Sequence, residues 1–224
     1  MFCGPSEHPI SQDEFLIDVL NLSTYLEIQD GIDYAIHQFE TRTFFCPILR
    51  FYLARAYRID NWIASAFREL MQHPILTFTL EDAWRIGILA YHKLMETRAH
   101  VDGLVRGLAY NPPQVANAPE CQTHEECDIA WQNEWLDQIA FELLHPDRHF
   151  EGRLMLERVE QANIPDMCDA CHQQTISAIQ STGIFERDTK LIDDAITELM
   201  RHQTDEQIRV SLREIVSRTT TDSV

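Results

Sequence analysis

Glycine and lysine are both scarce in this sequence, and each scarcity argues against a class of function. Only 7 of the 224 residues are glycine. None of them forms the glycine-rich loop that holds nucleotide phosphates, which argues against nucleotide hydrolysis. Lysine occurs only as Lys93 and Lys190, and 18 basic residues face 36 acidic ones, a formal net charge of -18. Because nucleic acids and anionic membranes are bound mainly through basic side chains, we expect no nucleic-acid partner and no membrane partner.

Long apolar runs are absent as well. No stretch approaches the roughly 20 apolar residues needed to span a bilayer. The first residues, Met-Phe-Cys-Gly-Pro-Ser-Glu-His, lack the basic and apolar regions of a secretory signal. We therefore expect an intracellular protein, cytoplasmic or nuclear. In that reducing environment, clustered cysteines serve as metal ligands or free thiols more often than as structural disulfides.

The sequence also lacks the pattern of β-strands, because no set of segments alternates convincingly between apolar and polar residues. Helical signals run through the chain instead. Capping boxes begin at Ser11 and Thr204, and a helix start at Thr79 is favoured by acidic residues in its first turn. The apolar spacing after Thr79 predicts one long helix that ends before Pro112, and Gly183 is expected to cap a later helix. The sequence therefore predicts an all-α fold of stacked antiparallel helix pairs.

Two segments near the N-terminus share one apolar pattern at an offset of 31 positions. The aligned pairs are Leu22 and Leu53, Ile28 and Ile59, Ile32 and Ile63, Ala35 and Ala66, Ile36 and Phe67, and Phe39 and Leu70. A repeat of this length that reads helix, turn, helix is typical of stacked αα units. We predict an αα-repeat lobe at 1–110, a proline-containing linker at 111–120 and a second helical lobe at 121–224.

Four of the six cysteines form two clusters about forty residues apart, each where a helical pattern begins. Cys121 and Cys127 form the first cluster. Cys168 and Cys171 form the second. Zinc prefers four tetrahedral Cys or His ligands, and its structural sites often join two such pairs. We identify these four cysteines as candidate zinc ligands, with the alternates being His124 and His172. Ordinary buried free thiols are the other interpretation.

An enzymatic alternative uses some of the same residues. His124, Glu126, Cys168 and Cys171 fit the ligand and proton-shuttle positions of a zinc-dependent nucleoside or nucleobase deaminase. The proline that should directly precede the cysteine pair is displaced to Pro165, and the strands of that fold are missing. A thioredoxin-like redox role would need a βαβ context that is also missing. We therefore predict no catalytic residues.

The tryptophans on the helix after the first cluster, Trp131 and Trp135, lie four residues apart on one face. That spacing is typical of core packing. A groove for a partner is the alternative interpretation.

Three further segments carry a resemblance to a known family. They are FLIDVLNLSTYLEIQDGIDYAIHQFE (15–40), LARAYRIDNW (53–62) and LEDAWRIG (80–87). These segments resemble the helices that follow the BTB/POZ domain in BTB proteins of mushroom-forming fungi. The two cysteine clusters are similar to clusters in many of those chains. Because only some fourteen residues precede the first segment, the resemblance implies the BACK-like helical region without the BTB domain itself. It implies no catalytic residue and no characterised substrate.

These observations together predict a non-catalytic scaffold of adaptor-like character that binds a protein partner. Its second lobe is expected to be clasped by structural zinc at the two cysteine clusters. No cofactor other than zinc is expected.

Overall fold

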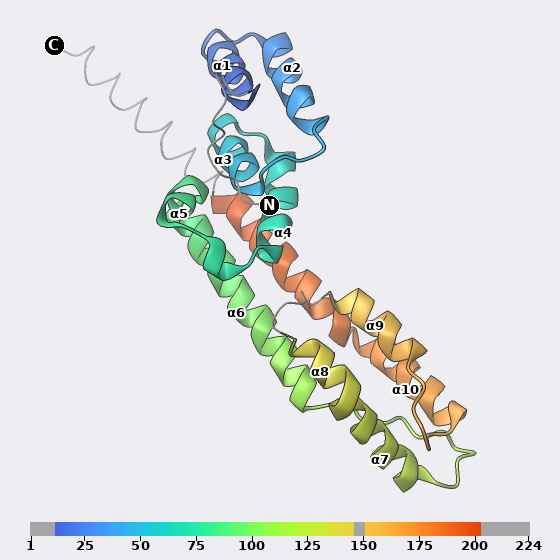
Figure 1. Cartoon of the computed structure of the whole chain (residues 1–224). Helices are drawn as coiled ribbons and strands as arrows, with labels where there is room; N and C mark the ends of the chain where they lie inside the picture. Colours follow the sequence, from blue (N-terminus) through green and yellow to red (C-terminus); the bar gives the residue numbers. More distant parts are fainter. Residues whose placement is uncertain (1–11, 146–150, 203–224) are drawn as a thin grey trace, which may run out of the picture. The chain divides into compact units, whose positions relative to one another are not determined.

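The computed structural model describes residues 12–145 and 151–202, and within these ranges every regular element is a helix (Figure 1). The predicted all-α class is therefore confirmed. The helices are α1 (Gln12–Tyr25), α2 (Gln29–Glu40), α3 (Pro47–Tyr57), α4 (Asp60–Gln72), α5 (Leu80–Ile86), α6 (Ile88–Tyr110), α7 (His124–Glu134), α8 (Ala140–Leu143), α9 (Gly152–Gln161) and α10 (Asp169–Thr182). A last helix covers residues 187–202. The capping boxes predicted at Ser11 and Thr204 include residues outside the described ranges.

The chain divides into two compact units. Unit 1 comprises Met1–His92 with Glu198–Val224, and unit 2 comprises Lys93–Thr197. The boundary after His92 lies within α6, whereas the sequence places a linker at 111–120. That segment belongs to unit 2, and the Ala118 side chain in it is buried in the core of this unit.

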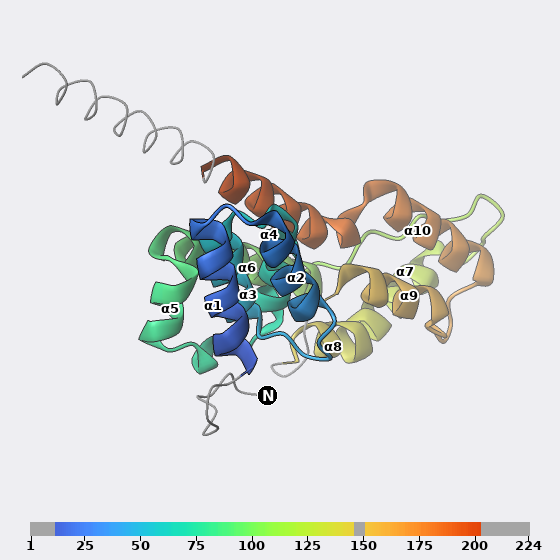
Figure 2. The ribbon, with the colours of Figure 1, turned by 90° about the horizontal axis from the view of Figure 1, so that it is seen from above.

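In unit 1, α1 packs on α2 and α3 packs on α4 (Figure 2). The two pairs use the same turn. Glu27 and Arg58, which are 31 positions apart, adopt left-handed φ angles of 57° and 59°. The next residue in each turn donates its backbone N–H back into the preceding helix, from Ile28 to the Ser23 carbonyl at 2.8 Å and from Ile59 to the Ala54 carbonyl at 2.9 Å. The repeat in the sequence therefore corresponds to a repeated turn, and the stacked arrangement of the pairs stays a prediction.

The single long helix predicted after Thr79 is interrupted. Its start is as expected, because Thr79 and Asp82 form both hydrogen bonds of a capping box. At Gly87, however, the backbone has a φ of 90°, which separates α5 from α6. The freed carbonyl of Ile86 accepts a hydrogen bond of 2.6 Å from Arg55 on α3. Glycine is needed here because a side chain is strained at this φ.

Unit 2 is built around the two tryptophans of the segment α7–α8. Trp131 and Trp135 are buried, and their indole N–H groups donate to the carbonyls of Pro113 at 2.9 Å and Leu108 at 3.1 Å. The prediction of core packing for this pair is confirmed. A π-helical turn (Trp135–Ile139) joins α7 to α8, and Gly183 caps α10 in the left-handed conformation, as predicted. Among the described residues, no helix combines the length and apolarity required to cross a membrane.

Candidate metal centre

The two cysteine clusters meet at one end of unit 2. The sulfur atoms of Cys121, Cys127, Cys168 and Cys171 all lie within 4.8 Å of one another. The sulfurs of Cys121 and Cys127 are 3.8 Å apart. Cys127 and Cys171 are buried, and Cys121 and Cys168 are half-buried. The four candidate ligands named from the sequence are therefore brought together into one group that could hold a metal ion.

The second pair is positioned by the first turn of α10. Cys168 is the N-cap residue of this helix, and its sulfur accepts a hydrogen bond of 3.4 Å from the Cys171 backbone N–H. A residue at the N-cap and one three positions later lie on the same side of the helix start, so both sulfurs face one point. The CxxC spacing is therefore sufficient to predict this half of the centre.

The first pair is positioned by tertiary contacts of the segment between α6 and α7. Thr175 is fully buried on α10, and its hydroxyl accepts a hydrogen bond of 3.1 Å from the Ala116 backbone and donates one of 2.7 Å to the Cys171 carbonyl. The hydrogen bond from Ala116 to Thr175 holds the segment against α10. The segment then leads into the start of α7 (Figure 1). Cys121 lies three residues before α7 and Cys127 lies in the first turn of α7, so both are placed beside the α10 pair.

Backbone amides donate to the sulfurs. Thr123 donates to Cys121 at 3.4 Å, and Ala118 donates to Cys171 at 3.3 Å. The Thr123 bond lowers the pKa of Cys121 to about 7. Burial raises the pKa of Cys127, against a lowering by the Cys168 backbone, and burial raises the pKa of Cys171 to about 12. Burial therefore favours the neutral thiol form of both Cys127 and Cys171.

The thiol of Cys171 has a second polar neighbour, because its sulfur donates to the Asn117 side-chain oxygen at 3.6 Å. Asn117, Ala118 and Thr123 are the residues around the centre that the sequence did not reveal. Two of them act through backbone N–H groups, which every residue except proline carries. No pattern of side-chain types could therefore have identified Ala118 or Thr123.

The remaining candidates lie outside the group of four sulfurs. The Nε2 atom of His124 is 3.2 Å from the Ala118 carbonyl oxygen, within hydrogen-bonding distance. The His172 ring lies 6.5 Å from the Trp131 ring, and its Nε2 is buried with no hydrogen-bond partner in the described part of the chain. Glu126, the proton shuttle of the deaminase alternative, is exposed at the surface of α7. Among the described residues, the group that could hold a metal ion consists of cysteines alone.

Comparison with protein-family models, with curated proteins and with solved structures gave no match.

Proposed function

We propose that this chain is a non-catalytic helical module for protein interaction, in which a structural zinc ion bound by Cys121, Cys127, Cys168 and Cys171 clasps unit 2. The observation that carries the zinc part is the convergence of the four sulfurs within 4.8 Å. Zinc–sulfur bonds of about 2.3 Å in a tetrahedron place the sulfurs roughly 3.8 Å apart. The 3.8 Å separation of the Cys121 and Cys127 sulfurs matches that edge.

The ligand set favours a structural role over catalysis. Four cysteines fill a tetrahedral zinc shell, so no position is left for the water that catalytic zinc activates. The deaminase alternative would need His124 as a ligand, and its Nε2 lies within hydrogen-bonding distance of the Ala118 carbonyl. Backbone N–H groups aimed at the sulfurs support the same proposal, because they offset the negative charge of thiolates. A thiolate centre also requires an intracellular, reducing compartment.

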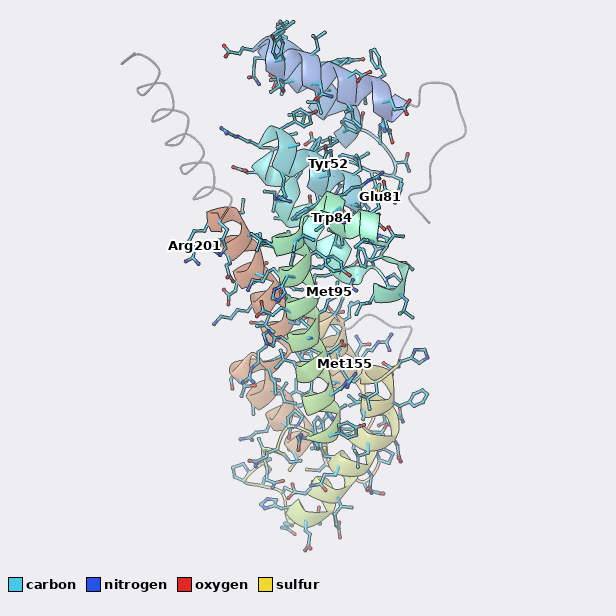
Figure 3. The ribbon with its side chains drawn as sticks, turned by 90° about the vertical axis from the view of Figure 1, so that its left-hand side faces the viewer. Tyr52, Glu81, Trp84, Met95, Met155 and Arg201 are labelled. Carbon is cyan, nitrogen blue, oxygen red and sulfur yellow. The ribbon has the colours of Figure 1, made fainter. Side chains whose placement is uncertain are left out.

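The interaction part rests on exposed apolar side chains of unit 1. Leu80 and Trp84, one helical turn apart on α5, are 75% and 65% exposed. Tyr52 on the neighbouring α3 is 45% exposed and lies on the same side of unit 1, as Figure 3 shows. Glu81 and Arg85 form an ion pair of 2.6 Å beside them. Aromatic side chains with a charged rim are typical of protein interfaces. We name Tyr52, Leu80 and Trp84 the α5 surface.

Metal analysis of protein purified without chelator tests the zinc part. We expect about one zinc per chain in the wild type, and less than a tenth of that in Cys168→Ser, with a lower melting temperature. The matched control is His124→Ala, which removes a nearby metal-binding side chain from outside the group of four and should keep its zinc. Metal-free wild-type protein whose stability equals that of Cys168→Ser would contradict the proposal.

Affinity capture tests the interaction part. A partner should be retained by the wild type and lost in Trp84→Ala. The control is Tyr25→Ala, which removes an aromatic side chain on α1 that is 85% exposed. Equal capture by both variants would refute a role for the α5 surface. Turnover of cytidine or adenosine that disappears in Glu126→Ala would instead support the deaminase alternative.

A further inference from the structure

The four sulfurs of the metal centre differ in their access to solvent. Cys127 and Cys171 are buried with no exposed surface, whereas Cys121 and Cys168 are half-buried. A small oxidant in solution can therefore reach the centre only through Cys121 or Cys168. Oxidation of a thiolate follows exposure and thiolate character, so the first sulfur to react is one of these two.

Cys121 is the better placed of the two for reaction. It belongs to the irregular segment before α7, whereas Cys168 is fixed as the N-cap of α10. Cys121 therefore combines partial exposure with a position outside any helix.

A resolving sulfur lies next to Cys121. The Cys127 sulfur is 3.8 Å away, and a disulfide of about 2.05 Å requires the gap to close by about 1.7 Å. All four sulfurs lie within 4.8 Å of one another, so other pairs are open, among them Cys168 with Cys171. The Cys171 sulfur is held by the Ala118 backbone at 3.3 Å and the Asn117 side chain at 3.6 Å. The Cys121 sulfur accepts one backbone hydrogen bond of 3.4 Å, from Thr123. Because Cys121 lies outside any helix, it can close the gap to Cys127 without moving a helical residue, whereas a bond between Cys168 and Cys171 would alter the first turn of α10.

We propose that this centre is a modification site for peroxide-class oxidants, which convert Cys121 and Cys127 to a disulfide and release the zinc. This inference rests on the proposed zinc centre. The Cys121 thiolate attacks one peroxide oxygen and becomes a sulfenic acid, and hydroxide leaves. The Cys127 thiolate then displaces hydroxide from that sulfur. The two sulfurs lose two electrons, hydrogen peroxide gains them, and two protons from solvent turn the two hydroxides into water.

The consequence of this disulfide is a loss of the connection between two helices. Cys121 and Cys127 flank the start of α7, so a bond between them makes no link to α10. Only Cys168 and Cys171 then remain for the metal, and two ligands are too few for a structural zinc site. Trp131 reports this event, because it lies on α7 and its indole donates to Pro113 in the segment that carries Cys121.

The test uses the zinc-loaded full chain and hydrogen peroxide. Released zinc is followed with a chromogenic chelator, and peptide mapping under non-reducing conditions locates the disulfide. We expect one disulfide per zinc released, linking Cys121 to Cys127, and recovery of zinc binding after reduction. A disulfide between any other pair of the four cysteines, or full zinc retention at peroxide levels that oxidise free cysteine, would overturn the inference.

Two matched variants sharpen this test. Cys121→His and Cys168→His each keep four zinc ligands and remove one exposed sulfur. Zinc release should slow at least tenfold in Cys121→His and change less than twofold in Cys168→His. Equal slowing of both would contradict the role of Cys121. If either variant fails to bind zinc, the disulfide map of the wild type decides. Zinc-free wild-type protein would refute the proposed function itself, so the two failures are distinguishable.

Discussion

Gly152, the first residue of α9, is packed so closely that the structure leaves no space for a side chain there. A methyl group there would lie 1.7 Å from the backbone carbonyl oxygen of Phe185 and 2.9 Å from Oδ1 of Asp188. Phe185 is buried, so its backbone cannot give way without moving the core. The other oxygen of Asp188 accepts a hydrogen bond of 3.2 Å from the Gly152 N–H. Gly152→Ala should therefore disturb both the packing and this bond.

The expected cost follows from the displacement required. An ordinary contact would need the two backbones to separate by more than an ångström, and overpacking of a core typically costs about 1–3 kcal/mol. Weakening a buried hydrogen bond to a carboxylate adds about 1 kcal/mol. We therefore expect Gly152→Ala to lower the free energy of unfolding of unit 2 by about 3 kcal/mol.

The same substitution on α6 provides the matched control. Gly107 lies within α6, and a methyl group there would meet no atom within 4 Å. It lines a cavity of about 260 Å³, so the methyl has room. Alanine favours a helix interior over glycine by about 0.8–1.0 kcal/mol, so Gly107→Ala should stabilise unit 2 by nearly that amount.

Urea unfolding of the two variants and the wild type, at equal zinc content, measures the difference. We expect the variants to differ by roughly 4 kcal/mol with opposite signs relative to the wild type. Equal stability of Gly152→Ala and Gly107→Ala would refute the close packing of α9 against Phe185.

Two further predictions concern the metal centre and unit 1. Burial raises the pKa of Cys127 and raises that of Cys171 to about 12, so both release a proton when zinc binds. Because two protons are released, the apparent affinity of the protein for zinc should rise at least about 100-fold per pH unit near neutrality. Competition titration with a chelator measures this affinity, and a rise below about tenfold per pH unit would contradict the prediction. In unit 1, Gly87→Ala places a side chain at a φ of 90° and 1.8 Å from the Arg55 guanidinium. It should lower the free energy of unfolding of unit 1 by about 2 kcal/mol, as urea unfolding measures. Unchanged stability would contradict the break between α5 and α6.

The helical class was predictable because apolar periodicity and caps both act over a few residues. The helix start at Thr79 and the glycine cap at Gly183 are found where the sequence predicts them. The break at Gly87 was not predicted. Gly103 and Gly107 lie in the same apolar pattern and remain helical. What distinguishes Gly87 is the Arg55 side chain on α3, which bonds the Ile86 carbonyl. That contact is tertiary, and the local sequence does not encode it.

The candidate metal site was predictable in part for a similar reason. Cys168 and Cys171 share one helical turn, so their spacing alone brings their sulfurs together. Cys121 and Cys127 are joined to that pair through the segment that Thr175 holds against α10. The sequence therefore identified the four candidate ligands without identifying the contacts that orient them. It also offered His124 as an alternate ligand, because a sequence does not reveal that its Nε2 lies near the Ala118 carbonyl.

The positions of the four sulfurs suggest what the proposed zinc would do for the fold. Helix N-termini are usually capped by oxygen-bearing side chains. In α7, the Thr123 side chain makes no capping bond, and its backbone N–H bonds the Cys121 sulfur instead. In α10, the cap is the sulfur of Cys168. Both helix starts therefore depend on sulfur, and thiolate charge is favourable at this end of a helix.

The core of unit 2 does not depend on the metal in the same way. Trp135, Val159 and Ile179 are buried side chains of this core that bind no metal. Burial of such side chains stabilises by about 1.5–3 kcal/mol each, so the core can persist when the centre is empty. Zinc would then fix the starts of α7 and α10 and the segment between α6 and α7. An oxidant that removes the metal would loosen that end of the unit while the rest stays folded, which is the behaviour required of a reversible switch.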